Sequence, residues 1–561
     1  MSEATITPTM TGGRCMAEMW KGYGVSHVFF VDAILRRAMV EAEELGIKRI
    51  LTHSEKAAAY MADGYARASG RVGVCMSQSV GAANLASGLQ DPYLAQSPVI
   101  AITGCHTAPM QHRNSYQELN HELLFGGVTK FHAKIETPEQ LPFLLRQAFR
   151  EASTGTPRPV HLDIVNHTGE LIAASSRAYD TTCEPEYGQY PPHRPLPDPV
   201  AIKRAAAAIK ASERPVVVVD RGAIIAGARE QLMALARKIG APVCISLDAK
   251  GIILDSDPLY GGAVGTYGSS AANHIVCEAD LVIFAGSNTG DMTTGAWKVP
   301  KAGTQVIQID IDPIELGRNY PGTIGIHSDV AAGLAALSAE ASSAKRESWL
   351  ATARGHLAEW NKHLDALPQQ EQPMWPSRLC AELTEILPND AIVISDTGYS
   401  AQWSGNMIGM TKPGQTYHRA AGSLGWSFPA AIGAKCGAPD KPVVVFTGDG
   451  GFYYHAMELE TARRWGINLV VVLNNNGGLA QGQRTINAAY GNRAGRKQEL
   501  YEFGKFSFEN FAQQFDCFGA TVDKASDFAK TFKAALAANK PAVIDVRTQF
   551  TAIAPDPWLP A

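Results

Sequence analysis

Short hydrophobic runs alternate with alanine-rich stretches of helical period along almost the whole chain. Clear examples of the hydrophobic runs lie at 214–227, 279–291, 304–313 and 540–550. Strand-like runs that alternate with helices in this way are typical of parallel sheets covered by helices. The pattern therefore predicts an α/β protein built from doubly wound parallel sheets.

Two breaks in this pattern divide the chain. The proline-rich segment 191–199, "PPHRPLPDP", reads as an extended linker, and a polar helical stretch at 338–372 reads as a second connector. We therefore expect three domains, at residues 1–185, 200–340 and 372–561. A chain of 561 residues is too long for one core, and its 45% hydrophobic content can fill several.

Composition narrows the class of function. The net charge of −4 and pI near 6.4, without a long run of like charge, favour small-molecule chemistry over binding to nucleic acid or an anionic membrane. Nine scattered cysteines without a CxxC pair argue against a disulfide framework and a structural zinc site. No basic start followed by an apolar core opens the chain, and no apolar run is long enough to span a bilayer. We expect a cytoplasmic enzyme.

The segment 443–478 carries the most specific chemistry. It reads as a strand ending in Gly-Asp-Gly-Gly, a helical stretch, and a second strand ending in three asparagines. Parallel strands would place Asp449 and Asn476 at neighbouring carboxyl ends of one sheet. Gly450 and Gly451 let backbone N–H groups approach a phosphate, and the carbonyl of Gly478 could join the two side chains around Mg²⁺. The alternative is a Gly-Asp-Gly turn and a strand end without a ligand.

A GDG followed by about 25 to 30 residues and an asparagine pair resembles the fingerprint of thiamine-diphosphate enzymes. The stretch 49–104 is similar to the first domain of the acetolactate synthase group, in which Glu55 occupies the glutamate position. The resemblance implies that Glu55 hydrogen-bonds to the pyrimidine ring of the cofactor and promotes its imino tautomer. Ser54 or His53 would cap the helix that Glu55 begins. The structural alternative is an acidic residue that favours a helix dipole.

The same resemblance assigns further cofactor contacts. Gly422 matches the backbone that contacts the pyrimidine, and Leu424 matches the apolar wedge that bends the cofactor, unless it is simply core. Gly398 and Ser400 match a second diphosphate-binding turn. The three domains then correspond to a pyrimidine-binding domain, a central nucleotide-binding-like domain and a diphosphate-binding domain. Since the two cofactor ends come from different subunits in this family, we expect a homodimer as the minimal unit, doubled to a homotetramer.

The choice of reaction depends on residues around the reacting carbon. Segment 112–131 is similar to acetolactate synthases and places Gln117 at the side chain that faces this carbon. The first loop departs from the family, so Asp32 either adds an acid near the reacting centre or caps the following helix. We expect decarboxylation of a 2-oxo acid with carboligation.

Three alternatives stay open. The flavin motif of acetolactate synthases is replaced by 286–295, which has no arginine, so FAD is not expected; an ADP-like nucleotide in the central domain is an open alternative. The double glycine at 477–478 and the turn at 220–227 resemble oxalyl-CoA decarboxylase and 2-hydroxyacyl-CoA lyase, which act on acyl-CoA substrates. A cofactor-binding paralogue without catalysis is the third, although Glu55, Asp449 and Asn476 are all present.

Overall fold

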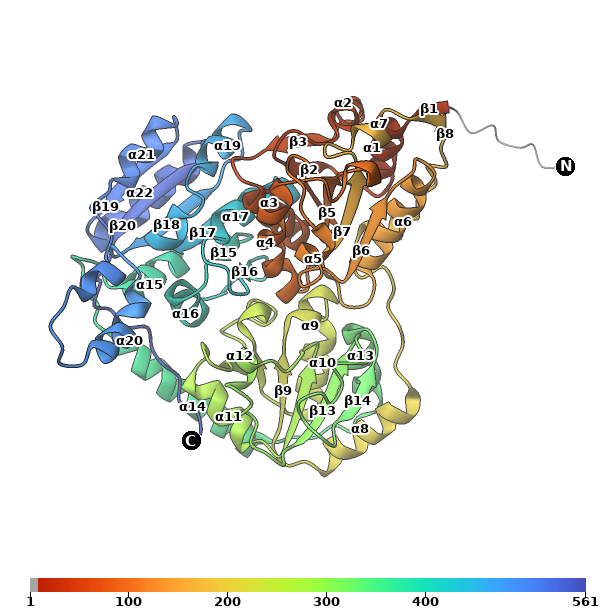
Figure 1. Ribbon diagram of the computed structural model, residues 1–561. Coiled ribbons are helices and arrows are strands. Elements are labelled where there is room, and N and C mark those ends of the chain that lie inside the picture. Colours follow the sequence, from red (N-terminus) through yellow and green to blue (C-terminus); the bar gives the residue numbers. More distant parts are fainter. Residues whose placement is uncertain (1–8) are drawn as a thin grey trace. The chain divides into compact units, whose positions relative to one another are not determined.

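Three parallel six-stranded sheets organise the protein, together with one short antiparallel pair of strands, β1 (Thr9–Thr11) and β8 (Ser176–Ala178) (Figure 1). The computed structural model describes residues 9–561. Two compact units share the chain: unit 1 contains the described residues up to 193 with 421–440 and 455–469, and unit 2 contains 194–420, 441–454 and 470–561. The predicted α/β class with three doubly wound parallel sheets is confirmed.

The sheet of unit 1 is parallel throughout and carries helices on both faces. Its strands, in sheet order, are β3 (Lys48–Leu51), β2 (His27–Phe30), β4 (Gly73–Ser77), β5 (Val99–Cys105), β7 (Val160–Val165) and β6 (Phe131–Ile135). One face packs against α1 (Gly12–Gly22), α2 (Arg36–Glu44), α6 (Gln140–Ser153) and α7 (Glu170–Ala173). The other carries α3 (Glu55–Ser69) and α4 (Gly81–Leu94), and α5 (His121–Phe125) packs on α4.

Helix α17 (Ser427–Gly437) joins unit 1 although it lies far along the chain. It packs on α3 so closely that a Cβ added to Gly433 would lie 1.8 Å from the Met61 carbonyl oxygen, and one added to Gly64 would lie 1.9 Å from the Ala430 carbonyl oxygen. Gly64 and Gly433 therefore set the separation between α3 and α17.

Helix α19 (Glu458–Arg464) also belongs to unit 1. Its first residue, Glu458, accepts a hydrogen bond of 3.0 Å from the backbone N–H of His53.

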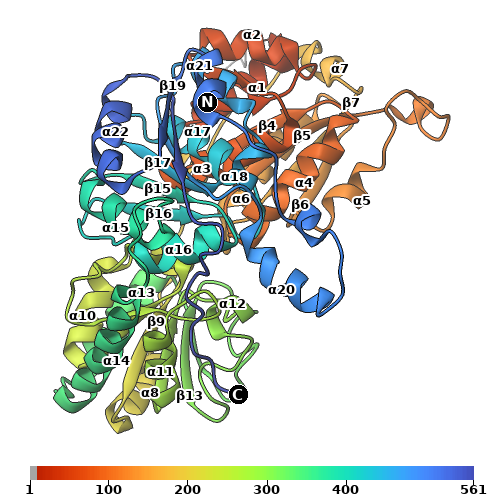
Figure 2. The ribbon, with the colours of Figure 1, turned by 90° about the vertical axis from the view of Figure 1, so that its left-hand side faces the viewer.

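The central sheet of unit 2 has the strand order of a dinucleotide-binding fold, with its first strand in the middle. Its strands, in sheet order, are β11 (Tyr260–Ala263), β10 (Val243–Ile245), β9 (Pro215–Val219), β12 (Leu281–Ala285), β13 (Gln305–Asp310) and β14 (Ile324–His327). Helices α8 (Pro199–Ala211), α10 (Arg229–Ile239) and α13 (Val330–Glu340) cover one face, and α11 (Ser270–Glu278) and α14 (Glu347–Asp365) cover the other (Figure 2). The predicted polar connector thus contains α14.

The third sheet repeats the strand order of the first. Its strands are β16 (Thr416–Arg419), β15 (Ile392–Ser395), β17 (Val443–Gly448), β18 (Val470–Asn475), β20 (Ala542–Arg547) and β19 (Phe518–Val522). Helices α15 (Pro376–Ile386) and α22 (Ala525–Ala537) share one hydrophobic core with it, and α21 (Phe508–Gln514) packs on β19. Short helices α16 (Tyr399–Met407), α18 (Asp449–Tyr453) and α20 (Ala480–Tyr490) follow β15, β17 and β18.

Side-chain chemistry agrees with two compositional inferences. All nine cysteines are free thiols, as expected for a chain without a disulfide framework. Across residues 9–561, every helix falls short of the length and apolar character that crossing a bilayer requires.

The contact between α3 and α17 predicts a large penalty for one methyl group. Gly433→Ala should lower the free energy of unfolding by about 3 kcal/mol, because the new Cβ would meet backbone atoms that cannot move independently. Gly355→Ala is the matched control: Gly355 lies in α14 with no atom within 4 Å of the added Cβ, so it should gain up to about 1 kcal/mol. Thermal unfolding measures both, and equal midpoints in the two variants would contradict the close approach.

Candidate active site

Glu55 occupies the first turn of α3, directly after the carboxyl end of β3. Ser54 is the N-cap, and its hydroxyl accepts a hydrogen bond of 3.1 Å from the backbone N–H of Ala57, which confirms one of the two predicted caps. Asn84 donates to Glu55 Oε2 at 3.1 Å. A Cβ on Gly81 would lie 2.6 Å from Glu55 Oε1, so a side chain at 81 would displace the carboxylate. Helix α4 therefore holds the Glu55 carboxylate through Asn84 and leaves space for it at Gly81.

The turn that carries Gly422 and Leu424 is fixed by a buried carboxylate. Asp91 accepts backbone hydrogen bonds from Ala421, Gly422 and Ser423, at 3.1, 3.2 and 3.1 Å. Leu424 is half-buried at the end of this turn, and the Gly422 backbone is exposed. Both predicted pyrimidine-site residues thus lie in unit 1 with Glu55.

Arg67 connects Asp91 to the helix that begins at Glu55. Its Nη2 lies 3.0 Å from Asp91 Oδ1 and 2.6 Å from Asp63 Oδ2, and all three side chains are buried. The indole N–H of Trp426 donates to Asp63 at 2.8 Å. This cluster was not singled out from the sequence, because nothing in the local pattern distinguishes these charges from an exposed helix face.

Gln117 lies in the loop that follows β5, in a backbone conformation with φ of +65°. Ser79 Oγ donates to its carbonyl oxygen at 2.5 Å, and His106 Nε2 donates to the carbonyl oxygen of Tyr116 at 2.7 Å. The side-chain Oε1 of Gln117 is buried and has no hydrogen-bond partner among the described residues. A held backbone and an unpaired amide oxygen are what a ligand-facing glutamine requires. Its role at the reacting carbon stays a prediction.

Asp32 does not cap α2. The N-cap position is Leu35, which makes no side-chain capping bond, and Asp32 lies three residues earlier. Instead Asp32 receives two hydrogen bonds from Arg36, at 3.1 and 2.7 Å, in an exposed ion pair. The interpretation as a cap is therefore wrong, because the helix starts later than the sequence pattern suggested. The assignment of Asp32 to catalysis stays a prediction.

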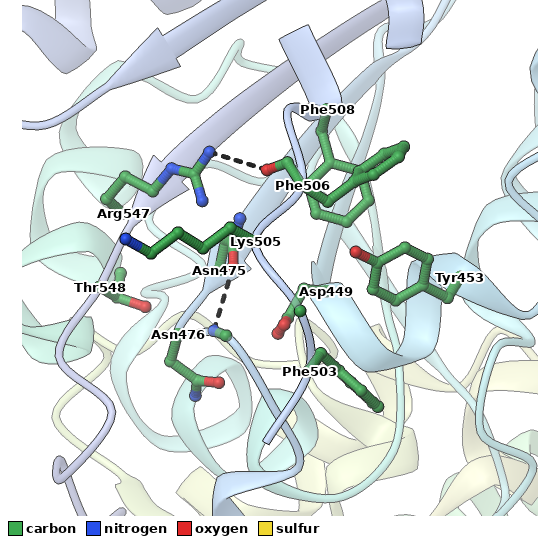
Figure 3. A pocket seen from close by; sticks show the side chains of 12 residues that line it. Asp449, Tyr453, Asn475, Asn476, Phe503, Lys505, Phe506, Phe508, Arg547 and Thr548 are labelled. Carbon is green, nitrogen blue, oxygen red and sulfur yellow. Dashed lines mark hydrogen bonds between the residues drawn. The ribbon is translucent and has the colours of Figure 1, made fainter. Parts of the chain in front are cut away.

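In unit 2, Asp449 and Asn476 follow the neighbouring parallel strands β17 and β18, as predicted. The single predicted helix between them is two helices, α18 and α19. Asp449, Asn475 and Asn476 line a pocket of about 200 Å³. Figure 3 shows the Asp449 carboxylate facing Asn475, the last residue of β18, and Asn476, which follows it.

Burial dominates the electrostatics of Asp449. Desolvation raises its pKa to about 7, although the backbone N–H groups of Gly450, Asp449 and Asn476 oppose the shift. Its Oδ1 is buried without a hydrogen-bond partner among the described residues. A buried carboxylate oxygen without a donor fits a cation ligand. The residues at this edge therefore match the chemistry of an Mg²⁺ and phosphate site.

The glycines of this site have steric roles. A Cβ on Gly478 would lie 2.1 Å from the Tyr501 carbonyl oxygen, because residues 501–503 cross the loop and Phe503 N–H donates to the Gly477 carbonyl at 2.8 Å. Gly450 and Gly451 are buried in α18, where added Cβ atoms would meet Leu479 at 2.6 Å and Thr447 at 2.8 Å. The backbone crossing thus explains the glycine at 478, whereas Gly477 has open space around an added Cβ and adopts a φ of +84°, which favours glycine.

The predicted second turn lies at the end of β15, which is the next strand of the sheet after β17. Gly398 precedes α16 with φ of +65°, a conformation that favours glycine. Ser400 is buried in the first turn of α16, and a Cβ on Gly448 would lie 3.6 Å from its hydroxyl. The two turns are therefore adjacent.

Three charged residues at this site were missed from the sequence. Asp545 on β20 is fully buried; its carboxylate accepts from Asn475 at 2.7 Å and pairs with Arg547 at 2.7 Å, while burial raises its pKa. Lys505 and Arg547 line the same pocket (Figure 3). The strand pattern of 540–550 conceals Asp545, since an inward aspartate in a buried strand has no local signature.

At the carboxyl ends of the central strands, the buried side chain of Asp220 is hydrogen-bonded to neighbouring hydroxyl groups. Asp220 is buried and accepts from Ser287 at 2.9 Å and from Thr293 at 3.3 Å. These contacts tie segment 286–295, which lacks the flavin-binding arginine, to the end of β9.

Comparison with known proteins supports the resemblance to thiamine-diphosphate enzymes over most of the chain. Three family models match: "Thiamine pyrophosphate enzyme, N-terminal TPP binding domain" at 10–124, "central domain" at 202–337 and "C-terminal TPP binding domain" at 396–546. The chain is 32% identical to a probable acetolactate synthase large subunit of Methanocaldococcus jannaschii, over 96% of this chain and 92% of the relative.

Two further relatives differ in their described activity. The chain is 32% identical to a probable 2-ketoarginine decarboxylase of Pseudomonas aeruginosa, over 84% of this chain and 83% of the relative. It is 31% identical to an acetolactate synthase large subunit of Corynebacterium glutamicum, over 89% and 80%.

The raised pKa of Asp449 predicts a pH-dependent stability in cation-free protein. An acid with pKa about 7 in the folded state and 3.8 as its ordinary value binds more protons folded than unfolded between these values. Wild-type stability should therefore fall from pH 4 to 7, by up to about 4 kcal/mol relative to Asp449→Asn. Urea unfolding with a chelator measures this difference. Asp365→Asn, at an exposed position, is the control, and a constant difference between wild type and Asp449→Asn would contradict the burial cost.

Proposed function

Because the chain belongs to the thiamine pyrophosphate enzyme family, we propose that it decarboxylates a 2-oxo acid and transfers the resulting carbon unit to an acceptor carbonyl. Thiamine pyrophosphate, also called thiamine diphosphate, acts when bound as the electron sink for cleavage of the bond beside a carbonyl. The observation that carries the proposal is the joint presence of a held Glu55 carboxylate and a buried, unpaired Asp449 oxygen at the carboxyl edges of two sheets.

In unit 1, the proposal gives Glu55 the task of accepting and sharing a proton at the pyrimidine end of the cofactor. Asn84 holds the carboxylate by a hydrogen bond, and Gly81 leaves the space that the carboxylate occupies. The Gly422 backbone is proposed to contact the pyrimidine, and Leu424 to support the bent cofactor from below. Gln117, and Asp32 in the changed first loop, are assigned to the substrate end.

In unit 2, Asp449, Asn476 and the Gly478 carbonyl are proposed to hold Mg²⁺. The backbone around Gly450 and Gly451 and the turn at Gly398 and Ser400 would bind the diphosphate. Support comes from the pocket that joins Asp449 to the asparagines and from its two cationic side chains, Lys505 and Arg547. Cations near phosphate oxygens stabilise the bound anion.

The 2-oxo acid reading is preferred to an acyl-CoA thioester. The double glycine that pointed toward the thioester enzymes has a backbone cause in this chain, because Tyr501 crosses Gly478 and Gly477 adopts a φ of +84°. The relatives named above act, by their descriptions, as acetolactate synthases or as a 2-ketoarginine decarboxylase. Incubation with pyruvate, 2-ketoarginine, oxalyl-CoA and a 2-hydroxyacyl-CoA separates these substrates. Product from a thioester alone would overturn the preference.

A homodimer, doubled to a tetramer, is proposed as the working assembly. The proposal rests on the resemblance to thiamine-diphosphate enzymes, in which the two ends of the cofactor are bound by different subunits. Nine free thiols favour a reducing cytosol as the location. For the central domain we propose no flavin; its strand order leaves an ADP-like nucleotide as the alternative ligand.

Magnesium binding should weaken as the pH falls. Only the ionised Asp449 carboxylate can coordinate the cation, and its pKa of about 7 means that a proton competes below neutrality. The Mg²⁺ affinity should therefore be about tenfold lower at pH 6 than at pH 8. Calorimetric titration with MgCl₂ in the presence of thiamine diphosphate measures it. An equal affinity at both pH values would argue that another group holds the ion.

Replacement of Glu55 tests the proposed chemistry. Glu55→Gln should lower turnover of the 2-oxo acid by at least about 100-fold, because the amide cannot exchange the proton. Gly81→Ala should also lower turnover, since its Cβ would displace the carboxylate. Glu44→Gln, at an exposed glutamate of the same unit, serves as the control and should retain wild-type turnover. Carbon dioxide release and product formation measure all three, and full activity of Glu55→Gln would remove this residue from the mechanism.

A further inference from the structure

A buried polar network lies behind the loop that carries Gln117. Thr103 Oγ1 stands at its centre, 2.7 Å from His161 Nε2, 3.2 Å from His121 Nδ1 and 2.8 Å from Asp163 Oδ1. The network joins four elements. Thr103 lies on β5, His161 and Asp163 lie on β7, and His121 begins α5. His132 on β6 extends the network, because its Nδ1 lies 2.8 Å from His161 Nδ1.

His121 connects two parts of the network through its ring nitrogens. Its Nδ1 lies 3.1 Å from the Asp163 carboxylate and 3.2 Å from Thr103 Oγ1, and its Nε2 lies 3.1 Å from the carbonyl oxygen of Ser79. A carbonyl oxygen only accepts, so Nε2 carries hydrogen and donates to Ser79. His121 therefore links the buried Asp163 and Thr103 to the Ser79 backbone.

Two partners in the network have shifted pKa values. Burial works to raise the pKa of Asp163, but hydrogen bonds from His121 and Thr103 and the neighbouring histidines hold that pKa below its usual value, so the carboxylate is charged. Burial lowers the pKa of His161 well below its usual value, which leaves this ring neutral. The titratable groups that face His121 or its partners are Asp163, His161, His132, Cys105 and Glu122.

Ser79 transmits the network to the active-site loop. Its carbonyl oxygen receives the His121 hydrogen bond, and its hydroxyl donates to the Gln117 carbonyl oxygen at 2.5 Å. Ser79 is 1% exposed, so water does not replace either contact. Gln117 sits at a φ of +65°, which costs energy for a residue with a Cβ and requires such an anchor.

We infer that His121 and Ser79 are positioning residues for Gln117. The His121 ring, anchored by Asp163, holds the Ser79 backbone, and the Ser79 hydroxyl holds the Gln117 backbone so that its unpaired side-chain oxygen faces the reacting group of the substrate. The inference rests on the proposed function for the identity of that substrate, a 2-oxo acid. The contacts in series are a property of unit 1 alone.

The same cluster could hold a metal ion, since ligand atoms of His121, His161 and Asp163 lie within 4.8 Å of one another. Two observations favour the hydrogen-bonded network. The Thr103 hydroxyl occupies the space between the three groups and contacts each of them. A divalent ion beside one buried carboxylate would also leave a net positive charge without a counter-ion.

Two measurements on the full-length protein, with thiamine diphosphate and Mg²⁺ bound, test the series arrangement. Ser79→Ala and His121→Asn should each lower kcat for the 2-oxo acid by about 10- to 100-fold, with the KM for thiamine diphosphate unchanged, because a misplaced side chain loses orientation rather than cofactor binding. Amide hydrogen exchange should show lost protection over residues 111–121 in both. The double variant should be no worse than Ser79→Ala alone, since the two residues act in one chain of contacts.

His132→Gln is the matched control, because it disturbs the outer end of the network without touching Ser79. It should keep both wild-type kcat and protection over 111–121. Additive losses in the double variant, unchanged protection in Ser79→Ala, or equal losses in His132→Gln would each overturn the inference. Stoichiometric zinc in purified wild type that is absent from His121→Asn would overturn it in favour of a metal site. Hydrogen exchange reads the contacts even if no 2-oxo acid is turned over, so failure of the proposed function is distinguishable.

Discussion

One buried guanidinium holds together the parts of unit 1 that the cofactor site needs. Arg67 lies between the carboxylates of Asp63 and Asp91 and stacks over the Trp426 ring at 4.4 Å. One positive charge cannot neutralise two buried negative charges, and the backbone N–H groups at 421–423 supply the remaining stabilisation. Removing the guanidinium would leave both carboxylates without their cation. The helix that begins at Glu55, the helix that carries Asp91 and the turn that ends at Leu424 therefore depend on the same interaction.

The first and third sheets use one topology for two different tasks. Both place their first strand between the second and the third, and both gather their functional side chains at the carboxyl ends of the strands. In unit 1 this edge presents the Glu55 carboxylate and Gln117; in unit 2 it presents Asp449, Asn476 and glycine turns. The central sheet has another strand order, and serine and threonine hydroxyls bind Asp220 at its edge. The first and third sheets therefore share one topology, and the residues in the loops after their strands determine how their chemistry differs.

The sequence predicted what local pattern and spacing control. Alternating runs identify parallel sheets, glycine before and after Asp449 identifies a tight turn, and Ser54 before Glu55 identifies a cap; each depends on residues within a few positions. Asp91, Asp545 and His121 could not be found in this way, because their partners lie far away in the chain. The start of α2 was misjudged for the same reason: Leu35, held in a left-handed conformation by its packing, delays the helix past Asp32. The assignment of helices 427–437 and 458–464 to unit 1 is likewise a product of tertiary packing.

The buried carboxylates of the third sheet explain why a cation and a phosphate would bind together. Burial raises the pKa values of both Asp449 and Asp545. The charge of Asp545 further raises the pKa of Asp449, and both carboxylates raise the pKa of Tyr453 after burial has done so. Arg547 compensates Asp545, whereas Asp449 has one oxygen without a donor. A divalent ion at Asp449 would satisfy this oxygen and add positive charge beside Lys505 and Arg547. The excess positive charge then needs an anion, and a diphosphate supplies it. Under the proposed function, the cation would offset the buried charge of Asp449 and the diphosphate would offset the positive charge that the cation adds, so each ligand would strengthen the binding of the other.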